Sequence, residues 1–223
     1  VAAQECDELG DLGRCDQALQ RREGGERAPR IVEAASGRGA DALREHTVDV
    51  LVSNAGVAPS APLHKTDDAL LQRVLATNLV APFRLARALV PAMVKRKRGR
   101  VIAIASTAAL KGYRYTAAYS ASKGGLVALV RALAAEVAGS GVTVNAVCPG
   151  FTDTDIVADA AQRIGSATGR SVDEAKGTLA AFSPLQRLIT PREVAELVAF
   201  LCSDAAASIH GQALALDGGE TTL

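Results

Sequence analysis

The segment VDVLVSNAG, residues 48–56, decides how this chain folds. Its first five residues are a short apolar and β-branched run, which is typical of a strand buried on both faces of a parallel sheet. Asn54, Ala55 and Gly56 follow this run and indicate the loop that leaves the strand. Residues 1–46 contain few large aliphatic side chains and no comparable run, so no element is predicted there with the same force.

Similar runs recur downstream and alternate with helical patterns. Apolar runs at residues 101–105, 142–147 and 212–216 predict three more buried strands. Helices are expected at about 66–78, 82–97, 117–138 and 192–203. This alternation predicts parallel strands joined by right-handed crossovers. The expected fold is therefore α/β, a doubly wound parallel sheet of the Rossmann-like type in a single domain.

Composition restricts the classes of partner. The 223 residues are 48% hydrophobic and 22% charged, and they contain no apolar run of about 18 residues, so no membrane span is expected. The 25 basic and 24 acidic side chains nearly cancel, which leaves no overall field to attract nucleic acid. The basic run at residues 95–98 lies at the end of a predicted helix, where cations suit the helix dipole. Neither nucleic acid nor a membrane is expected as a partner, so any partner must be recognised by a local site.

Cysteines and histidines give no sign of a metal site. The four cysteines and three histidines are dispersed, without the clustered spacing that a zinc site needs, so no metal is expected. Scattered thiols in a chain of this length fit a reducing compartment, and a cytoplasmic location is expected.

Polar chemistry is concentrated where the predicted strands end. Tyr119 and Lys123 are four residues apart in a predicted helix, so they share a face. A cation beside a phenol favours the phenolate and is expected to lower the pKa of Tyr119 toward a useful range. Ser106 ends the neighbouring strand and offers a hydroxyl to a substrate oxygen. A serine nucleophile is less favoured, because no G-x-S-x-G elbow surrounds it.

Taken together, these residues resemble the short-chain dehydrogenase/reductase family. The resemblance rests on five motifs in the family's order, and it covers about residues 47–223. The motifs are Ser53 to Gly56 after a strand, Asn78 in the next helix, Ser106, the pair Tyr119 and Lys123, and Pro149-Gly150 with Thr154. A lone Y-x-x-x-K would be weak, whereas five motifs at predicted strand edges or helix faces are specific.

The resemblance implies an NAD(P)-dependent oxidoreductase that interconverts a secondary alcohol and a ketone. Tyr119 would be the acid that protonates the carbonyl oxygen, Ser106 would hold that oxygen, and Lys123 would bind the nicotinamide ribose. Asn78 would order a water in a proton relay. The cofactor, NAD or NADP, would lie against two groups of residues: Asn54, Ala55 and Gly56 on its adenine side, and Pro149, Gly150 and Thr154 beside its nicotinamide. General similarity favours a 3-ketoacyl thioester or 3-hydroxyacyl substrate, and a homodimer or homotetramer.

Each of these roles has a plainer alternative. Ser106 can simply end a strand, and the Asn54 to Gly56 segment can be only a turn. A buried Asn78 can bond neighbouring backbone instead of a water. Tyr119 can be an interface aromatic and Lys123 a solvated helix charge.

The front of the chain departs from the family pattern. Members of the family begin with a strand and a T-G-x-x-x-G-x-G turn that cradles the pyrophosphate, and neither the glycines at 10 and 13 nor those at 37 and 39 match it. Residues 1–46 are therefore expected to be an atypical or incomplete N-terminal βαβ region. Missing upstream sequence, an altered reading frame and a lost loop remain open explanations. A catalytically silent homologue, acting as an oligomeric binding or structural subunit, is the alternative function.

Residues 151–185 form a longer connection than usual and are expected to be a substrate lid. Several apolar side chains in this segment either cover a lipophilic substrate or pack between ordinary helices. The apolar face of the helix at 117–138 indicates either subunit pairing or core packing.

Overall fold

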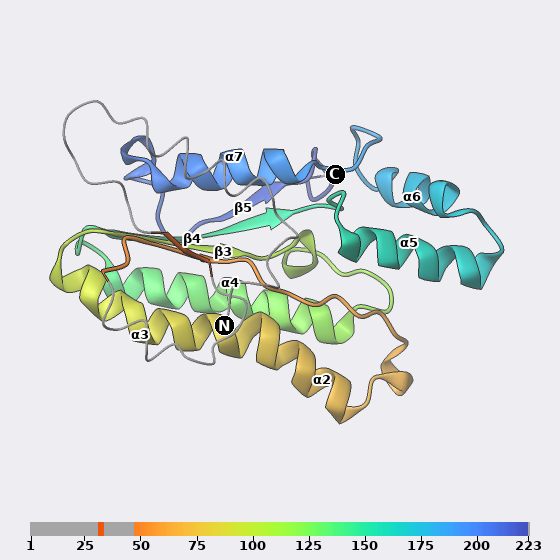
Figure 1. The fold of residues 1–223 in the computed structure, drawn as a ribbon, viewed down its shortest axis with the longest axis horizontal. Coiled ribbons are helices and arrows are strands. Elements are labelled where there is room, and N and C mark those ends of the chain that lie inside the picture. The colour runs from red at the N-terminus through yellow and green to blue at the C-terminus, as the bar shows by residue number, and fades with distance from the viewer. Residues whose placement is uncertain (1–30, 34–46, 223) are drawn as a thin grey trace.

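The computed structural model describes residues 31–33 and 47–222, and its centre is a five-stranded parallel sheet (Figure 1). The strands are β1 Ile31–Glu33, β2 Val50–Ser53, β3 Gly99–Ile104, β4 Val142–Pro149 and β5 Ala213–Leu216. They lie in the order β1-β2-β3-β4-β5, and every neighbouring pair is parallel. The predicted α/β fold with a parallel Rossmann-like sheet is confirmed.

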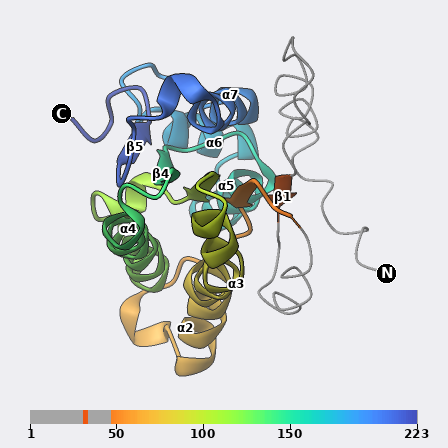
Figure 2. The ribbon, with the colours of Figure 1, turned by 90° about the vertical axis from the view of Figure 1, so that its left-hand side faces the viewer.

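Helices cover both faces of the sheet. They are α2 Asp68–Leu75, α3 Ala81–Lys95, α4 Ala117–Val137, α5 Asp155–Thr168, α6 Val172–Ala180 and α7 Pro191–Cys202. Figures 1 and 2 show α3 and α4 on one face and α7 on the other. Of the described helices, none is long and apolar enough to cross a membrane.

Two hydrophobic clusters, one on each face of the sheet, explain why the strands are mostly apolar. Successive side chains of a strand point to opposite faces. Leu51 accordingly packs with Leu85 and Leu126 toward α3 and α4, whereas Val50 and Val52 pack toward α7. Because both faces of the sheet are buried, most strand residues are apolar on either face and the pattern does not alternate.

The helical segment before β3 differs from its prediction. Two helices were expected with a break after residue 78, but α2 runs into α3 through a π-helical turn, Ala76–Val80. Asp67 caps α2 and accepts a hydrogen bond from the Leu70 N–H at 2.8 Å. Pro82 is the second residue of α3, just after the π-helical turn.

Strand β1 is the one described element upstream of residue 47. It pairs with β2 in the register Ile31 to Val50. The glycines at positions 10, 13, 37 and 39, which the sequence did not favour as a phosphate loop, lie outside the described residues.

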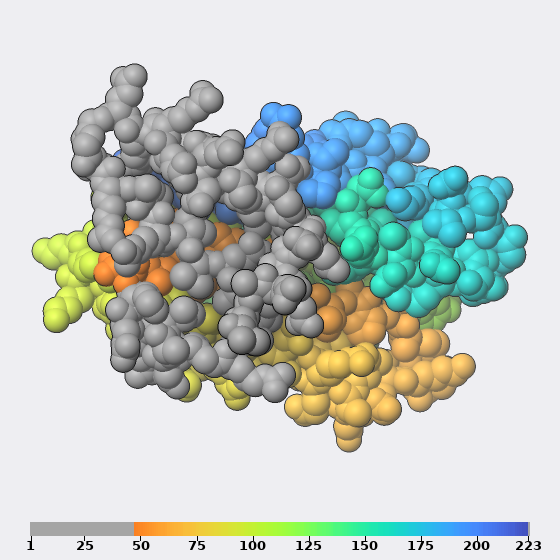
Figure 3. All heavy atoms as spheres, viewed as in Figure 1, coloured from red at the N-terminus to blue at the C-terminus, as the bar shows by residue number. Residues whose placement is uncertain are grey.

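Helices α5 and α6 form a pair of their own beyond the carboxyl end of the sheet. They gather at one end of the molecule in Figure 3. Val157 and Ala161 of α5 are buried with Ala175 and Leu179 of α6. Part of the apolar character of residues 151–185 therefore comes from helix packing, which was one of the two readings of the sequence.

Candidate active site

The site lies at the carboxyl edge of the sheet, where Ser106, Tyr119 and Lys123 meet. Strands β2, β3 and β4 are neighbours in register, so the residues that follow them emerge side by side. Parallel α/β sheets bind ligands at this edge. Helix α4 then brings Tyr119 and Lys123 to the end of β3 from one face of the sheet.

Ser106 is positioned by its backbone and by Tyr119. It is the N-cap of the short 3₁₀ helix Thr107–Ala109, and its Oγ accepts a hydrogen bond from the Ala108 N–H at 3.1 Å. Its hydroxyl also hydrogen-bonds with the Tyr119 phenol. The serine therefore does more than end a strand, because its side chain faces the tyrosine of α4.

Lys123 is buried beneath this pair, with only 3% of its surface exposed. Its Nζ donates to the Ile104 carbonyl at 2.7 Å and lies 5.9 Å from the centre of the Tyr119 ring. Burial lowers the pKa of this ammonium to about 8. The reading of Lys123 as a solvated helix charge is thus wrong: the amine is held inside the site.

The pKa of Tyr119 departs from the sequence prediction. A lowered phenol pKa was expected from the neighbouring cation, but the structure raises it, chiefly because burial disfavours the phenolate. The hydrogen bond from Ser106 acts in the opposite direction and lowers it. The expectation failed because spacing along a helix reports which groups are close but not how much water surrounds them.

Asn78 is fully buried in the π-helical turn, and its bonds fix the loop after β2. Its Oδ1 accepts from the Val57 N–H at 2.9 Å, and its Nδ2 donates to the Val57 carbonyl at 3.0 Å and to Ser122 Oγ at 2.9 Å. This is the backbone bonding that the sequence left open as an alternative. The water relay through Asn78 stays a prediction.

The loop after β2 leaves space beside the amine. A Cβ built on Gly56 would stand 3.4 Å from Lys123 Nζ and 3.5 Å from Asn78 Oδ1, so any larger residue would fill the gap between them. Asn54 and Ile104 line a small pocket with Pro191, Val194 and Val198 of α7. Ala55 lies between Asn54 and Gly56 and is partly exposed. The contact of these residues with a dinucleotide stays a prediction.

The other predicted cofactor residues follow β4. Pro149 ends the strand, and the Gly150 N–H donates to the Leu216 carbonyl at 3.1 Å. A Cβ on Gly150 would come 3.2 Å from Asp217, so glycine allows the turn after β5 to approach. Thr154 precedes α5 and donates its hydroxyl to the Thr152 carbonyl at 3.3 Å. These residues border the same edge as Ser106, and their contact with a cofactor stays a prediction.

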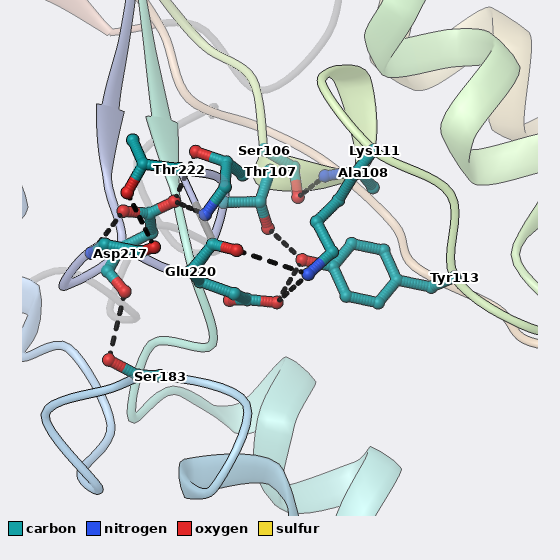
Figure 4. A network of polar contacts seen from close by, with 11 residues as sticks. Ser106, Thr107, Ala108, Lys111, Tyr113, Ser183, Asp217, Glu220 and Thr222 are labelled. Atoms are coloured by element: carbon teal, nitrogen blue, oxygen red, sulfur yellow. Dashed lines mark hydrogen bonds and ion pairs between the residues drawn. The ribbon is translucent and has the colours of Figure 1, made fainter.

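Sequence reasoning missed a second polar cluster next to Ser106, drawn in Figure 4. The Tyr113 phenol donates to the Glu220 carboxylate, and Lys111 forms an ion pair with the same carboxylate at 3.4 Å. The partners are about a hundred residues apart, so no short motif contains them. The only signal in the sequence was a charged residue directly after the Asp217-Gly-Gly turn.

Metal ligands do not gather in the described ranges. No group of three or more His, Cys, Asp or Glu side chains lies close enough there to hold an ion. Cys148 is fully buried at the end of β4, where its thiol hydrogen-bonds to the backbone of Ser106.

Comparison with known proteins agrees with this geometry. Residues 32–221 match the model of a protein family described as enoyl-(acyl carrier protein) reductase, which is of the short-chain dehydrogenase type. The chain belongs to the short-chain dehydrogenase/reductase family. Its members are NAD(P)-dependent oxidoreductases, so this chain is assigned to that class of enzyme.

Several curated family members resemble the chain over most of its length. It is 41% identical over 174 residues to a Streptomyces coelicolor protein named provisionally as a ketoacyl reductase, covering 77% of this chain and 67% of that protein. It is 39% identical over 172 residues to the 3-oxoacyl-(acyl-carrier-protein) reductase of Escherichia coli, covering 77% and 66%. The chain thus spans about two thirds of the length of these relatives.

Solved structures show the same fold. A variant of actinorhodin polyketide ketoreductase with NADPH superposes with a TM-score of 0.79 at 37% identity, over 85% of this chain and 76% of the other. The L-sorbose reductase of Gluconobacter frateurii, complexed with NADPH and L-sorbose, superposes with a TM-score of 0.77 at 30% identity, over 86% and 76%.

Proposed function

We propose that this chain is an NAD(P)H-dependent ketoreductase that interconverts a ketone and a secondary alcohol. The observation that carries the proposal is the convergence of a phenol, a hydroxyl and a buried amine at the carboxyl edge of the sheet. Relatives named as ketoacyl reductases and a related ketoreductase with NADPH support it. A 3-ketoacyl thioester is the substrate class that these names favour.

In this mechanism Tyr119 is the general acid. Ser106 donates a hydrogen bond to the substrate carbonyl oxygen, and the Tyr119 phenol delivers a proton to the same oxygen as the carbon is reduced. A phenol whose pKa is raised holds its proton at neutral pH, which suits the direction of ketone reduction. The nicotinamide supplies the hydride when it is bound.

The remaining predicted residues are proposed to bind the cofactor and to orient the groups around it. Lys123, fixed on the Ile104 carbonyl, presents its ammonium to the nicotinamide ribose and the phenol. Gly56 leaves room for the dinucleotide beside this amine, with Asn54 and Ala55 on the adenine side. Pro149, Gly150 and Thr154 border the nicotinamide, and Asn78 holds the loop from which a relay water reaches Lys123.

The segment 151–185 is proposed as the substrate lid. Phe151 and Phe182 lie at its two ends and contact Tyr113, with ring centres 5.7 Å and 5.9 Å away. The side chain of Phe182 is nearly half exposed, so it offers an apolar surface to a lipophilic substrate. Such a surface suits an acyl chain or a cyclic ketone.

We also propose that the chain acts as a homodimer or homotetramer in the cytoplasm. Leu126 and Val130 of α4 are buried in the core of the subunit, while Leu129 and Leu133 are only partly buried. These two leucines leave apolar surface on α4 for a second copy. Sedimentation velocity should give two or four times the subunit mass of 22.9 kDa, and a monomer at micromolar concentration would contradict this proposal.

Cofactor titration tests the proposed function. NADH and NADPH fluorescence should change on addition of the protein, and oxidation of NADPH should follow the addition of an acetoacetyl thioester or a simple cyclic ketone. Tyr119→Phe should bind NADPH as tightly as the wild type without turnover. No binding of either nucleotide at millimolar concentration would favour the catalytically silent homologue, which the missing glycine-rich pattern suggests.

A further inference from the structure

Glu220 is a buried carboxylate at the edge of the proposed active site. It lies in the turn after β5 and is 4% exposed. Figure 4 shows its side chain pointing toward Tyr113 and Lys111. Its Oε1 receives the Tyr113 hydroxyl, and its Oε2 is buried without a hydrogen-bond partner. Burying a carboxylate with one oxygen unpaired costs folding free energy, which suggests that Glu220 has a function at this position.

The contacts of Glu220 lead directly to the proposed catalytic serine. The Tyr113 hydroxyl is also hydrogen-bonded to Thr107 Oγ1, at 2.8 Å. Thr107 is the residue after Ser106 and is 2% exposed. The 3₁₀ helix that Ser106 caps is therefore tied through Tyr113 to the carboxylate. A shift of Glu220 would move the backbone that aims the Ser106 hydroxyl.

Local charge keeps the carboxylate in this position. Lys111 Nζ lies 3.4 Å from Glu220 Oε1 and 3.4 Å from the Glu220 carbonyl oxygen, and 5.3 Å from the centre of the Tyr113 ring. On the other side, a Cβ built on Gly150 would stand 3.3 Å from Oε2. The carboxylate is thus confined between the serine segment and the turn after β4.

The turn that carries Glu220 is itself rigid. Asp217 accepts hydrogen bonds from the N–H groups of Gly219 and Thr221, each at 2.9 Å, and from the Thr221 hydroxyl at 2.7 Å. Ser183, at the end of the proposed lid, donates its hydroxyl to the Asp217 carbonyl at 3.0 Å. The carboxylate is therefore a fixed point, shared by the serine segment and the lid.

We propose that Glu220 is a positioning residue for the ketoreductase site: through Tyr113 and Thr107 it fixes Ser106 for the substrate carbonyl. The inference rests on the proposed function. It assigns Glu220 no contact with the reacting atoms. Misplacing a catalytic group by about 1 Å can cost on the order of 100-fold in rate, so a fixed anchor matters here.

The test compares Glu220→Ala with Glu220→Gln. The alanine variant removes the acceptor for Tyr113, and kcat should fall by about 10- to 100-fold with the dissociation constant of NADPH unchanged. The glutamine variant keeps an acceptor oxygen of the same shape, and kcat should stay within about threefold of the wild type. The control is Glu196→Gln, which makes the same chemical change at an exposed position of α7 and should leave kcat unaltered.

Two further measurements separate positioning from a general loss of stability. Hydrogen exchange of the amides at 107–113 should become faster in Glu220→Ala, while the strands stay protected. Tyr113→Phe should lower kcat as much as Glu220→Ala does, and the double variant should be no worse than either, because both changes break one pathway.

The outcomes are distinct. If the wild type reduces ketones and Glu220→Ala keeps its kcat and its exchange rates, the inference is wrong and the proposed function stands. If Glu220→Ala has a lower melting temperature but an unchanged kcat, calculated for the protein that binds NADPH, Glu220 has only a structural role and the inference is again wrong. If the wild type binds NADPH but reduces no ketone, the proposed function fails and the inference falls with it.

Discussion

Two tyrosines six residues apart face the same edge of the sheet with partners of opposite charge. Tyr119 lies over the Lys123 ammonium and hydrogen-bonds with Ser106. Tyr113 donates to the Glu220 carboxylate. Burial raises the pKa of both phenols, and for Tyr113 the carboxylate raises it further. The same side chain is thus placed in two electrostatic settings.

The difference shows how a protein gives one residue type two roles. A phenol beside a cation can give up its proton during reaction and recover it afterwards, because the phenolate has a favourable partner. A phenol bonded to a carboxylate keeps its proton, because the phenolate would face another anion. Tyr119 therefore suits proton transfer, whereas Tyr113 suits a permanent hydrogen bond.

The largest expected effect compares the two phenols directly. Tyr119→Phe should lower kcat by about 10³-fold, within the range known for loss of a general acid, with NADPH affinity kept. Tyr113→Phe should lower kcat by roughly 10- to 100-fold, since it disturbs only the placement of Ser106. Stopped-flow measurement of NADPH oxidation checks both. Equal losses of kcat in the two variants would show that the two phenols do not have different roles.

Removal of the serine hydroxyl should come next. Ser106→Ala deletes one hydrogen bond to the developing oxyanion, and kcat should fall on the order of 100-fold. It also deletes the hydrogen bond that lowers the pKa of Tyr119, so the phenol should titrate at higher pH in the variant. Ultraviolet difference titration and steady-state kinetics check the two parts. An unchanged kcat would exclude Ser106 from the reaction.

The buried amine predicts a pH dependence. The pKa of Lys123 is about 8 in the folded protein and near 10.5 when exposed, so the folded state releases this proton first. Above pH 8 the value of kcat/KM for NADPH should fall, because the ribose loses its cationic partner. Stability should instead rise between pH 8 and 10.5, because the unfolded chain binds the proton more tightly.

A matched variant isolates this titration. Lys123→Met should give a low kcat/KM for NADPH without a break near pH 8. Pre-steady-state NADPH binding across pH 6 to 10 provides the measurement. A wild-type profile that stays flat to pH 10 would show that Lys123 titrates elsewhere or takes no part in binding.

The smallest expected effect is the loss of folding stability when the Tyr113 hydroxyl is removed. Tyr113→Phe leaves the buried Glu220 without its donor and should reduce the free energy of unfolding by about 1–3 kcal/mol. Tyr115→Phe is the control: Tyr115 is exposed and its hydroxyl contacts only Arg114 among the described residues, so a change of less than about 0.5 kcal/mol is expected. Urea unfolding at pH 7 measures both. Equal losses of unfolding free energy in the two variants would show that the hydrogen bond from Tyr113 to Glu220 does not stabilise the fold.

Local patterns predicted much of this site. Strands β2, β3 and β4 were predicted because burial on both faces makes most of their residues apolar. Tyr119 and Lys123 were found because a four-residue spacing puts them on one helix face. Ser106 was found because polar residues that end parallel strands meet at one edge.

Long-range electrostatics could not be predicted in the same way. The pKa of Tyr119 depends on burial, which depends on the packing of the whole edge. The contact between Tyr113 and Glu220 joins residues 107 positions apart, and it required the complete sheet order. The π-helical turn at 76–80 was also missed, because its residues are as compatible with an ordinary helix as with a wider one.

That wider turn has a consequence for the tolerance of the chain to deletions. A π-helical turn contains one residue more than the α-helical turn it replaces. Removing Thr77 would let α2 and α3 merge into one regular helix without rotating either helix about its axis, because one turn replaces another. The change should be local, and it would shift the Asn78 amide that holds the loop after β2. The chain should therefore tolerate a deletion here better than a deletion within α2 or α3, where the remaining residues would rotate by about 100°.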